Sequence, residues 1–246
     1  MKPTIRGKTS NFKTTSDKRS TATTIDRTTE NETAAMIIDC SEIPGGSLSG
    51  VYTVYIDYQP VEIYCELRAD SDTKKTGTTD FYWNWHEYKQ GFGNVNFEYW
   101  LGNDNLHKIL SSKNYKLRID LEDWNGNAKY ADYNTFVVGS EDTNYTLTIS
   151  GYSGDAGDSI INPPSDSMSQ MYGMEFSTSD RDNDKIPFYK AAESTRSGWW
   201  LKWSTDANLN GVYYKGGQTA SDGIFWKSWQ SSQYSLKSVS MKIKPS

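Results

Sequence analysis

The chain has 246 residues and a formal net charge of −5, and 35 % of its residues are hydrophobic and 14 % aromatic. This length suffices for one large domain with a tail or for two small domains, and the acidic balance argues against nucleic acid as a partner. No apolar run is long enough to cross a bilayer, so no membrane span is expected. Residues 1–13 also lack the apolar stretch of a signal peptide.

Residues 1–35 have the composition of a disordered tail. Thirteen of them are Ser or Thr and the apolar ones are scattered without a period, so this segment cannot bury enough surface to offset the entropy cost of ordering. It carries seven Lys or Arg and four Asp or Glu, which leaves the acidic charge to residues 36–246, the predicted folded domain. Asn31 begins a glycosylation sequon within the tail.

The first half of the predicted domain contains strands and two short helices. β-Branched and aromatic residues predict strands over 51–56 and 61–65. Apolar residues at helical spacing predict a short helix within 81–90 and a second one near 104–110. Residues 115–121 alternate between apolar and polar side chains, which is typical of a strand with one buried face.

The second half begins with a hairpin and then loses its regular pattern. Asn125-Gly126 favours a tight turn, and residues 129–138 and 145–149 continue as strands. Residues 151–225 are rich in Gly, Asp, Asn and Ser, and they are too many for an ordinary loop. We interpret them as an ordered, loop-built subdomain. Residues 233–244 alternate again and predict a returning strand.

Several longer motifs follow one another between residue 37 and the C-terminus. They include Asp39-Cys40-Ser41-Glu42-Ile43, Trp85-His86-Glu87-Tyr88-Lys89-Gln90-Gly91-Phe92-Gly93, Phe97-Glu98-Tyr99-Trp100-Leu101-Gly102-Asn103, Asp180-Arg181-Asp182-Asn183-Asp184, Gly198-Trp199-Trp200 and Asn208-Leu209-Asn210-Gly211-Val212-Tyr213-Tyr214. In this order they resemble the fibrinogen C-terminal domain family, whose members include blood-clotting chains, ficolin- and tachylectin-like lectins and angiopoietin-like ligands. The resemblance implies an α+β fold with a disulfide-pinned N-terminal part, a central antiparallel sheet with short helices, and a loop-rich calcium-binding subdomain.

The two cysteines, Cys40 and Cys65, allow either one disulfide or two buried thiols when their sequence is considered alone. The resemblance implies that they are bonded to each other in a secreted, extracellular protein, although no signal peptide is visible. The family also has a Gly-Gly-Trp strand after the second cysteine. Residues 66–79 occupy that interval here, and they are rich in Ser, Asp, Lys and Thr, so this strand is expected to be absent from the central sheet.

The acidic motif that ends at Asp184 is a candidate calcium site. Alternate carboxylates in a tight loop can bring several oxygens onto a hard cation such as Ca²⁺. The alternative is an ordinary solvated acidic turn. The resemblance implies that the side chains of Asp182 and Asp184 bind Ca²⁺, together with carbonyl groups near Ile186 and Phe188.

A ligand pocket is expected beside the acidic motif, since lectin-like members have one there. The residues at the matching positions are Trp203, Ser204, Thr205, Ala220 and Ser221. A family disulfide is missing, because Ala191 and Ser204 stand at its two positions, and Thr205 replaces the usual His. The side chains with which the lectins bind an acetyl group are therefore not conserved in this chain. The Asp and Arg with which clotting chains hold a basic peptide end are also replaced. Trp199 and Trp200 could stack on sugars, but packing within the subdomain is the preferred interpretation.

Catalysis is not expected. Ser153 lies in a segment similar to a nucleophile elbow, but Asp155 stands where that motif needs Gly. The chain has two histidines, His86 and His107, and both lie in motifs that we interpret as scaffold. Asn144 begins a second sequon, which could carry a glycan or form an unmodified turn.

Three functions remain open. The first is a secreted, calcium-dependent recognition protein of lectin or innate-immune type with an altered pocket. The second is an angiopoietin-like module that binds a protein and needs no sugar pocket. The third is a degenerate or truncated copy with little ligand binding. The expected partner is a glycan or an extracellular protein, and an oligomer is compatible with each function.

Overall fold

A computed structural model describes residues 36–67, 77–230 and 232–246. The expected tail and its sequon at Asn31 lie outside these residues. The described elements are, in chain order, η1 (Cys40–Glu42), β1 (Gly50–Ile56), β2 (Gln59–Cys65), α1 (Trp85–Gln90), β3 (Phe92–Gly93), β4 (Tyr99–Trp100), α2 (Asn103–Ser112), β5 (Tyr115–Glu122), β6 (Ala128–Val138), η2 (Glu141–Thr143), β7 (Leu147–Gly154), η3 (Ser167–Ser169), α3 (Ala191–Thr195), β8 (Ala207–Asn208), β9 (Phe225–Trp226) and β10 (Ser238–Pro245).

The N-terminal part is a two-stranded hairpin, β1–β2, joined to η1 by a disulfide. The strands pair antiparallel from Gly50 opposite Cys65 to Ile56 opposite Gln59. Both residues of the connecting turn have positive φ, which matches the right-handed twist of the flanking strands. The disulfide joins Cys40 to Cys65, as the resemblance implied, and their Cα atoms are 5.5 Å apart.

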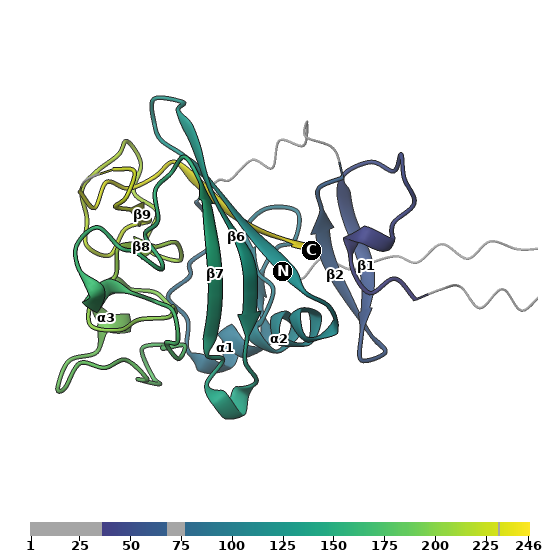
Figure 1. Cartoon of the computed structure of the whole chain (residues 1–246), viewed down its shortest axis with the longest axis horizontal. Helices are drawn as coiled ribbons and strands as arrows, with labels where there is room; N and C mark the ends of the chain where they lie inside the picture. Colours follow the sequence, from purple (N-terminus) through teal and green to yellow (C-terminus); the bar gives the residue numbers. More distant parts are fainter. Residues whose placement is uncertain (1–35, 68–76, 231) are drawn as a thin grey trace, which may run out of the picture. The chain divides into compact units, whose positions relative to one another are not determined.

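The central sheet is antiparallel and has the strand order β10-β5-β6-β7 (Figure 1). The alternation in β5 places Leu117, Ile119 and Leu121 on its buried face, as the sequence predicts. The Asp123 carboxylate accepts hydrogen bonds from the N–H groups of Asn125 and Asn127, which shapes the hairpin turn between β5 and β6. In the described part of the chain, β10 is an outer strand of this sheet.

Helices α1 and α2 lie together at the sheet, and α2 contacts β6 (Figure 1). The α1 helix begins at Trp85 because the Asn84 side chain accepts from the N–H groups of the first turn. Two glycines, Gly91 and Gly102, let the segments at the end of α1 and the start of α2 approach closely. A Cβ on Gly102 would lie 2.6 Å from the Gln90 carbonyl oxygen, so no other residue fits without a backbone shift.

The core beneath the helices is built from aromatic rings. Trp200 contacts Phe176 edge to face, and its indole N–H donates to the Tyr145 carbonyl at 2.8 Å. Trp199 packs against Trp200, and both are 1 % exposed. The preferred interpretation of these two tryptophans as packing residues is therefore confirmed.

The loop-rich subdomain follows β7 and contains η3, α3 and the short pair β8–β9. Two sequence-predicted boundaries are wrong here. Tyr145 is in a left-handed turn, so β7 starts at Leu147 and continues to Gly154 instead of ending at Ile149. β10 starts at Ser238, five residues later than the alternation suggested. Within the described part of the chain, every helix is too short or too polar to cross a bilayer.

Candidate functional site

The acidic loop is anchored to the helical layer by Asp180. Its carboxylate accepts from the Trp85 backbone N–H at 2.9 Å and from the Thr178 hydroxyl at 2.7 Å. A two-residue turn between Thr178 and Arg181 is closed by backbone hydrogen bonds in both directions. Asp180 therefore has a structural role at the start of α1, separate from the carboxylates that follow it.

Asp182 and Asp184 lie close together in the next turn. The Asp184 N–H donates to an Asp182 carboxylate oxygen at 3.2 Å, and the Asp184 carboxylate accepts from the N–H groups of Ile186 and Ala191. Burial raises the pKa of Asp184 above its usual value, and the Asp182 charge adds to the rise, although the two N–H groups oppose it. Two neighbouring carboxylates with this mutual repulsion form a pair that a cation would stabilise.

The two carbonyl positions lie just after this pair. Phe188 has a φ of 66°, a left-handed conformation that is rare for a bulky residue, and its side chain is fully exposed. A cavity of about 680 Å³ is lined by Asp182, Phe188, Tyr189, Lys190, Glu193 and Ser194. The structure thus brings Asp182 and Phe188 to one hollow, whereas Asp184 and Ile186 are joined by a hydrogen bond beside it.

The donor chemistry of this loop suits calcium. No group of three or more His, Cys, Asp or Glu side chains that could hold a metal occurs among the described residues. Ca²⁺ can also take backbone carbonyls and water as ligands, besides carboxylates. The two carboxylates and the turned backbone at Phe188 are the kinds of ligand that it requires.

The predicted ligand-pocket residues lie in two segments of the loop-rich subdomain, 203–205 and 220–221. In the first, the N–H groups of Trp203 and Ser204 both donate to the Met168 carbonyl, and the Ser204 hydroxyl lies 2.6 Å from that of Ser169. Thr205 is 5 % exposed, and its hydroxyl donates to the Ala207 carbonyl. The Thr205 hydroxyl therefore bonds within its own loop, whereas Trp203 and Ser204 are both exposed, Trp203 at 46 %.

The second group lies in a turn between two other segments. The Ala220 N–H donates to the Gln233 carbonyl, and the Gly223 N–H donates back to the Ala220 carbonyl. Ser221 is exposed at the tip of this turn. The 680 Å³ cavity is lined by none of the five predicted pocket residues, and neither is the larger cavity beside β10.

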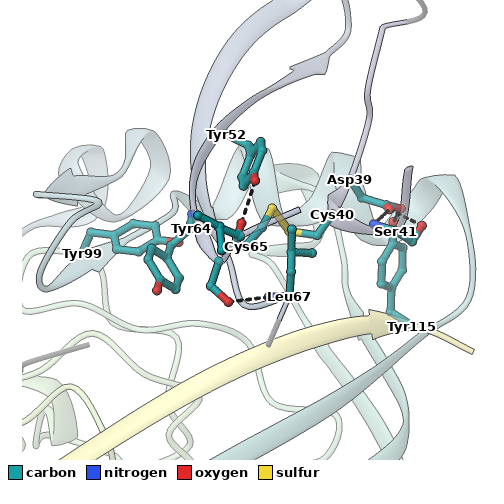
Figure 2. The surroundings of a disulfide bond; sticks show 11 residues. Asp39, Cys40, Ser41, Tyr52, Tyr64, Cys65, Leu67, Tyr99 and Tyr115 are labelled. Carbon is teal, nitrogen blue, oxygen red and sulfur yellow. Dashed lines mark hydrogen bonds between the residues drawn. A yellow bond between two sulfur atoms is a disulfide. The ribbon is translucent and has the colours of Figure 1, made fainter. Parts of the chain in front are cut away.

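The disulfide lies beside a buried carboxylate, that of Asp39 (Figure 2). Asp39 is 5 % exposed and accepts from the hydroxyls of Ser41 and Tyr115 and from the Lys113 ammonium group. Burial alone would raise the pKa of Asp39, but the hydrogen bonds from Ser41, Tyr115 and Lys113 outweigh it and lower the pKa to about 2. This network ties η1 to the start of β5.

The larger cavity, of about 1270 Å³, lies along β10 and was not predicted as a site. Its walls include β10, the end of β2 at Ile63–Leu67 and the segment around Phe97. The one signal in the sequence was the expected absence of a strand between residues 66 and 79. Within that interval, the described residues 66–67 and 77–79 contain no strand.

The side chains of Asn144 and His107 have hydrogen-bond partners within the domain. The Asn144 amide nitrogen donates to Glu175 at 2.8 Å, and its oxygen accepts from Arg181. A glycan on that nitrogen would compete with the hydrogen bond to Glu175, so the geometry favours the unmodified turn. His107 lies 2.8 Å from the Val138 carbonyl oxygen, and His86 lies in the first turn of α1.

Comparisons with known proteins agree on one family. Residues 36–246 match the family described as "Fibrinogen beta and gamma chains, C-terminal globular domain". The chain is 42 % identical to human fibrinogen-like protein 1, over 84 % of this chain and 72 % of that protein. It is 38 % identical to angiopoietin-related protein 7 of Bos taurus over 89 % of this chain, and it spans 65 % of the length of that relative.

Solved structures give the same result. The fibrinogen-like globe domain of human ANGPTL2 matches with a TM-score of 0.73 and 35 % identity, over 82 % of this chain and 94 % of that one. A lamprey fibrin D-dimer, complexed with the peptide ligand Gly-His-Arg-Pro-amide, matches with a TM-score of 0.77 and 34 % identity, over 91 % of this chain and 78 % of that one. These similarities bear out the expected α+β fold.

Proposed function

Because the chain belongs to the fibrinogen C-terminal domain family, whose domains are non-enzymatic binding modules, we propose that it is an extracellular module that binds a protein through the surface beside its acidic loop. One observation carries this proposal. Phe188 is fully exposed, and it borders a hollow together with Tyr189 and the carboxylate of Asp182. Aromatic side chains are enriched at the centre of protein interfaces, and charged groups lie mostly at the rim.

A protein ligand is favoured over a sugar. A sugar site needs several polar side chains that converge on one enclosed hollow. Here the Thr205 hydroxyl is bonded within its own loop, and Ala220 and Ser221 lie in a different turn. The relatives also support this choice, since they are angiopoietin-related and fibrinogen-like proteins, and one solved relative was crystallised with a peptide ligand.

In this proposal, calcium holds the loop that presents the aromatic side chains. The carboxylates of Asp182 and Asp184 and the carbonyl groups of Ile186 and Phe188 would bind Ca²⁺, which neutralises the repulsion between the carboxylates. The location outside the cell is supported by the disulfide between Cys40 and Cys65, because such bonds persist in oxidising compartments.

The test is a binding screen with two parallel arms. The oxidised chain is presented to an array of cell-surface receptor ectodomains and to a glycan array, each in calcium and in chelator. We expect binding to a protein target that weakens in chelator, and a loss of that binding in the Phe188→Ala/Tyr189→Ala variant. Tyr58→Ala is the matched control, because Tyr58 is also an exposed aromatic residue (83 %) but lies in the β1–β2 turn. Binding to glycans alone, or binding that survives in the double variant, would contradict the proposal.

A further inference from the structure

Among the described residues, one edge of β10 has no strand partner. β10 pairs along Ser238–Pro245 with β5, and no described strand pairs with its other edge. An unpaired edge presents a row of backbone N–H and C=O groups that can accept another strand. An extended strand of this length offers roughly 26 Å of such an edge.

The apolar face of β10 is also only partly covered. Val239, Met241 and Ile243 stand in register with the β5 residues Leu121, Ile119 and Leu117. The three β5 side chains are at most 2 % exposed, whereas the three β10 side chains are half-buried. The side chains that cover β5 therefore do not extend fully over β10.

The space beside the open edge is a large cavity. Its volume of about 1270 Å³ exceeds the roughly 300–1,000 Å³ of pockets for small molecules, and residues from both faces of β10 line it. The opposite wall contains Ile63, Leu67 and Phe97. Figure 2 shows the yellow strand β10 passing near Leu67, and both line the cavity.

An ion pair indicates the width of this space. The Lys242 ammonium group pairs with the Glu66 carboxylate, just after β2. The longest reach of a lysine and a glutamate joined end to end is on the order of two strand spacings of about 4.8 Å each, so the ion pair sets an upper limit on this gap. A gap at that limit accommodates one added strand.

We propose that this cavity binds an extended segment of a partner protein, in which apolar residues alternate with acidic ones, as an added strand along the open edge of β10. The apolar side chains of the segment would pack against Val239, Met241 and Ile243. Its backbone would form hydrogen bonds with β10, as in other cases of β-strand addition. This binding site is separate from the acidic loop, so the inference does not depend on the function proposed above.

The acidic character of the segment follows from the charges on the polar face. Lys116 and Lys244 stand opposite each other on β5 and β10, and both are exposed. Among the described residues, neither forms a salt bridge, whereas Lys242 is neutralised by Glu66 and Asp120. The end of the edge is therefore positively charged and favours an acidic strand.

The same charges disfavour two other occupants. A second copy of the chain would offer the apolar face of its own β10, but β10 contains no acidic residue that could pair with Lys116 and Lys244. The sequence of residues 68–76 contains one apolar residue, Ala69, which does not match the apolar wall. A partner segment of alternating pattern fits both the apolar face and the charge.

The first experiment uses the oxidised full chain and labelled synthetic peptides. One peptide alternates Val and Ile with Glu, and the other alternates them with Lys. We expect the acidic peptide to bind and to protect the backbone amides of residues 238–245 from hydrogen exchange. Two N-methylated versions of the acidic peptide, modified at alternate positions, should differ in affinity, because only one set of peptide N–H groups faces β10. Equal binding of the two versions, or protection elsewhere in the chain, would overturn the proposal.

Charge reversal tests the specificity without touching the core. The Lys116→Glu/Lys244→Glu variant should lose roughly fivefold in affinity for the acidic peptide and gain affinity for the basic one. Lys215→Glu, in an exposed loop, is the matched control and should change neither affinity. An unchanged preference in the double variant would overturn the acidic assignment. If the free chain dimerises and its β10 amides are protected from hydrogen exchange, the occupant is a second copy of the chain. That result would overturn the proposal of a partner segment.

Discussion

At the scale of single residues, polar side chains in this domain are placed by the hydrogen bonds that they can form. Asp39 and Asp180 illustrate this, since each accepts hydrogen bonds from residues distant in the sequence. Both lie in acidic motifs, but in the structure each carboxylate joins two segments of the chain by hydrogen bonds. Asp182 and Asp184 differ from them because their hydrogen-bond donors lie within the same loop.

Replacing Asp39 with Asn should lower the free energy of unfolding by about 2 kcal/mol at neutral pH, because the folded-state pKa of about 2 lies below the ordinary value of 3.8. A lowered folded-state pKa gives stability that is present above the unfolded pKa and is lost as the pH falls. The difference between variant and wild type should therefore shrink between about pH 4 and pH 2. Urea unfolding across this range measures it. Asp142→Asn, at an exposed site, is the control, and a pH-independent difference would contradict the assignment.

Two tryptophans offer a matched comparison of buried and exposed sites. Trp200→Phe should lower the free energy of unfolding by about 2 kcal/mol or more, because it leaves a void and removes the donor to the Tyr145 carbonyl. Trp203→Phe, at a side chain that is 46 % exposed, should change it by less than about 0.5 kcal/mol. Chemical denaturation of both variants is the measurement. Equal losses would show that Trp203 also packs in the core.

At the scale of elements, the hairpin β1–β2 depends on its connection to η1. A two-stranded hairpin is marginally stable by itself in water. Here the disulfide, the Asp39 network and the hydrogen bond from the Tyr64 N–H to the Tyr99 hydroxyl attach it to the rest of the domain (Figure 2).

Removing the disulfide should therefore destabilise this element first. Cys40→Ser/Cys65→Ser opens a loop with a sequence separation of 25, for which the chain-entropy account gives about 3 kcal/mol. Hydrogen exchange should show faster opening of β1 and β2 than of β5 and β6. Reductant should have the same effect on the wild type and no effect on the variant. A uniform increase in exchange over the whole domain would contradict local opening.

At the scale of the whole molecule, the loop-rich subdomain has few strands among its described residues, and the resemblance to the family implies that Ala191 and Ser204 stand at the positions of a second disulfide. Its order should then depend on the proposed calcium ion. Binding to the folded state alone adds about 2.7 kcal/mol at a hundredfold excess over Kd, which raises the melting temperature by several degrees.

Three variants test this by thermal unfolding in calcium and in chelator. Asp182→Ala and Asp184→Ala should abolish the difference between the two conditions. Asp180→Ala should lower the midpoint in both conditions, because Asp180 supports α1, and should keep the difference. If calcium leaves the melting temperature of the wild type unchanged, the proposed calcium site is wrong. Loss of the difference in Asp180→Ala would show that the ligands are assigned to the wrong residues.

The sequence by itself determined the local elements and the family. The alternation of residues 115–121, the Asn125-Gly126 turn and the spacing of Cys40 and Cys65 each depend on neighbouring residues or on motif order, so they can be recognised without a structure. The sequence also predicts that a strand is absent after Cys65. Among the described residues, β10 is an outer strand of the sheet.

Only the tertiary structure decided how distant segments combine. Tyr145 turns out of β7 because its ring packs on Trp85 and its hydroxyl donates to Asp104 on α2, and neither contact is local. Thr205 and Ser221 were predicted to line one pocket, but the Thr205 hydroxyl bonds to Ala207 in its own loop, and Ser221 lies in a turn closed by Ala220 and Gly223. The cavity beside β10 likewise needs walls from segments more than a hundred residues apart. Such contacts depend on three-dimensional packing, which local sequence patterns do not encode.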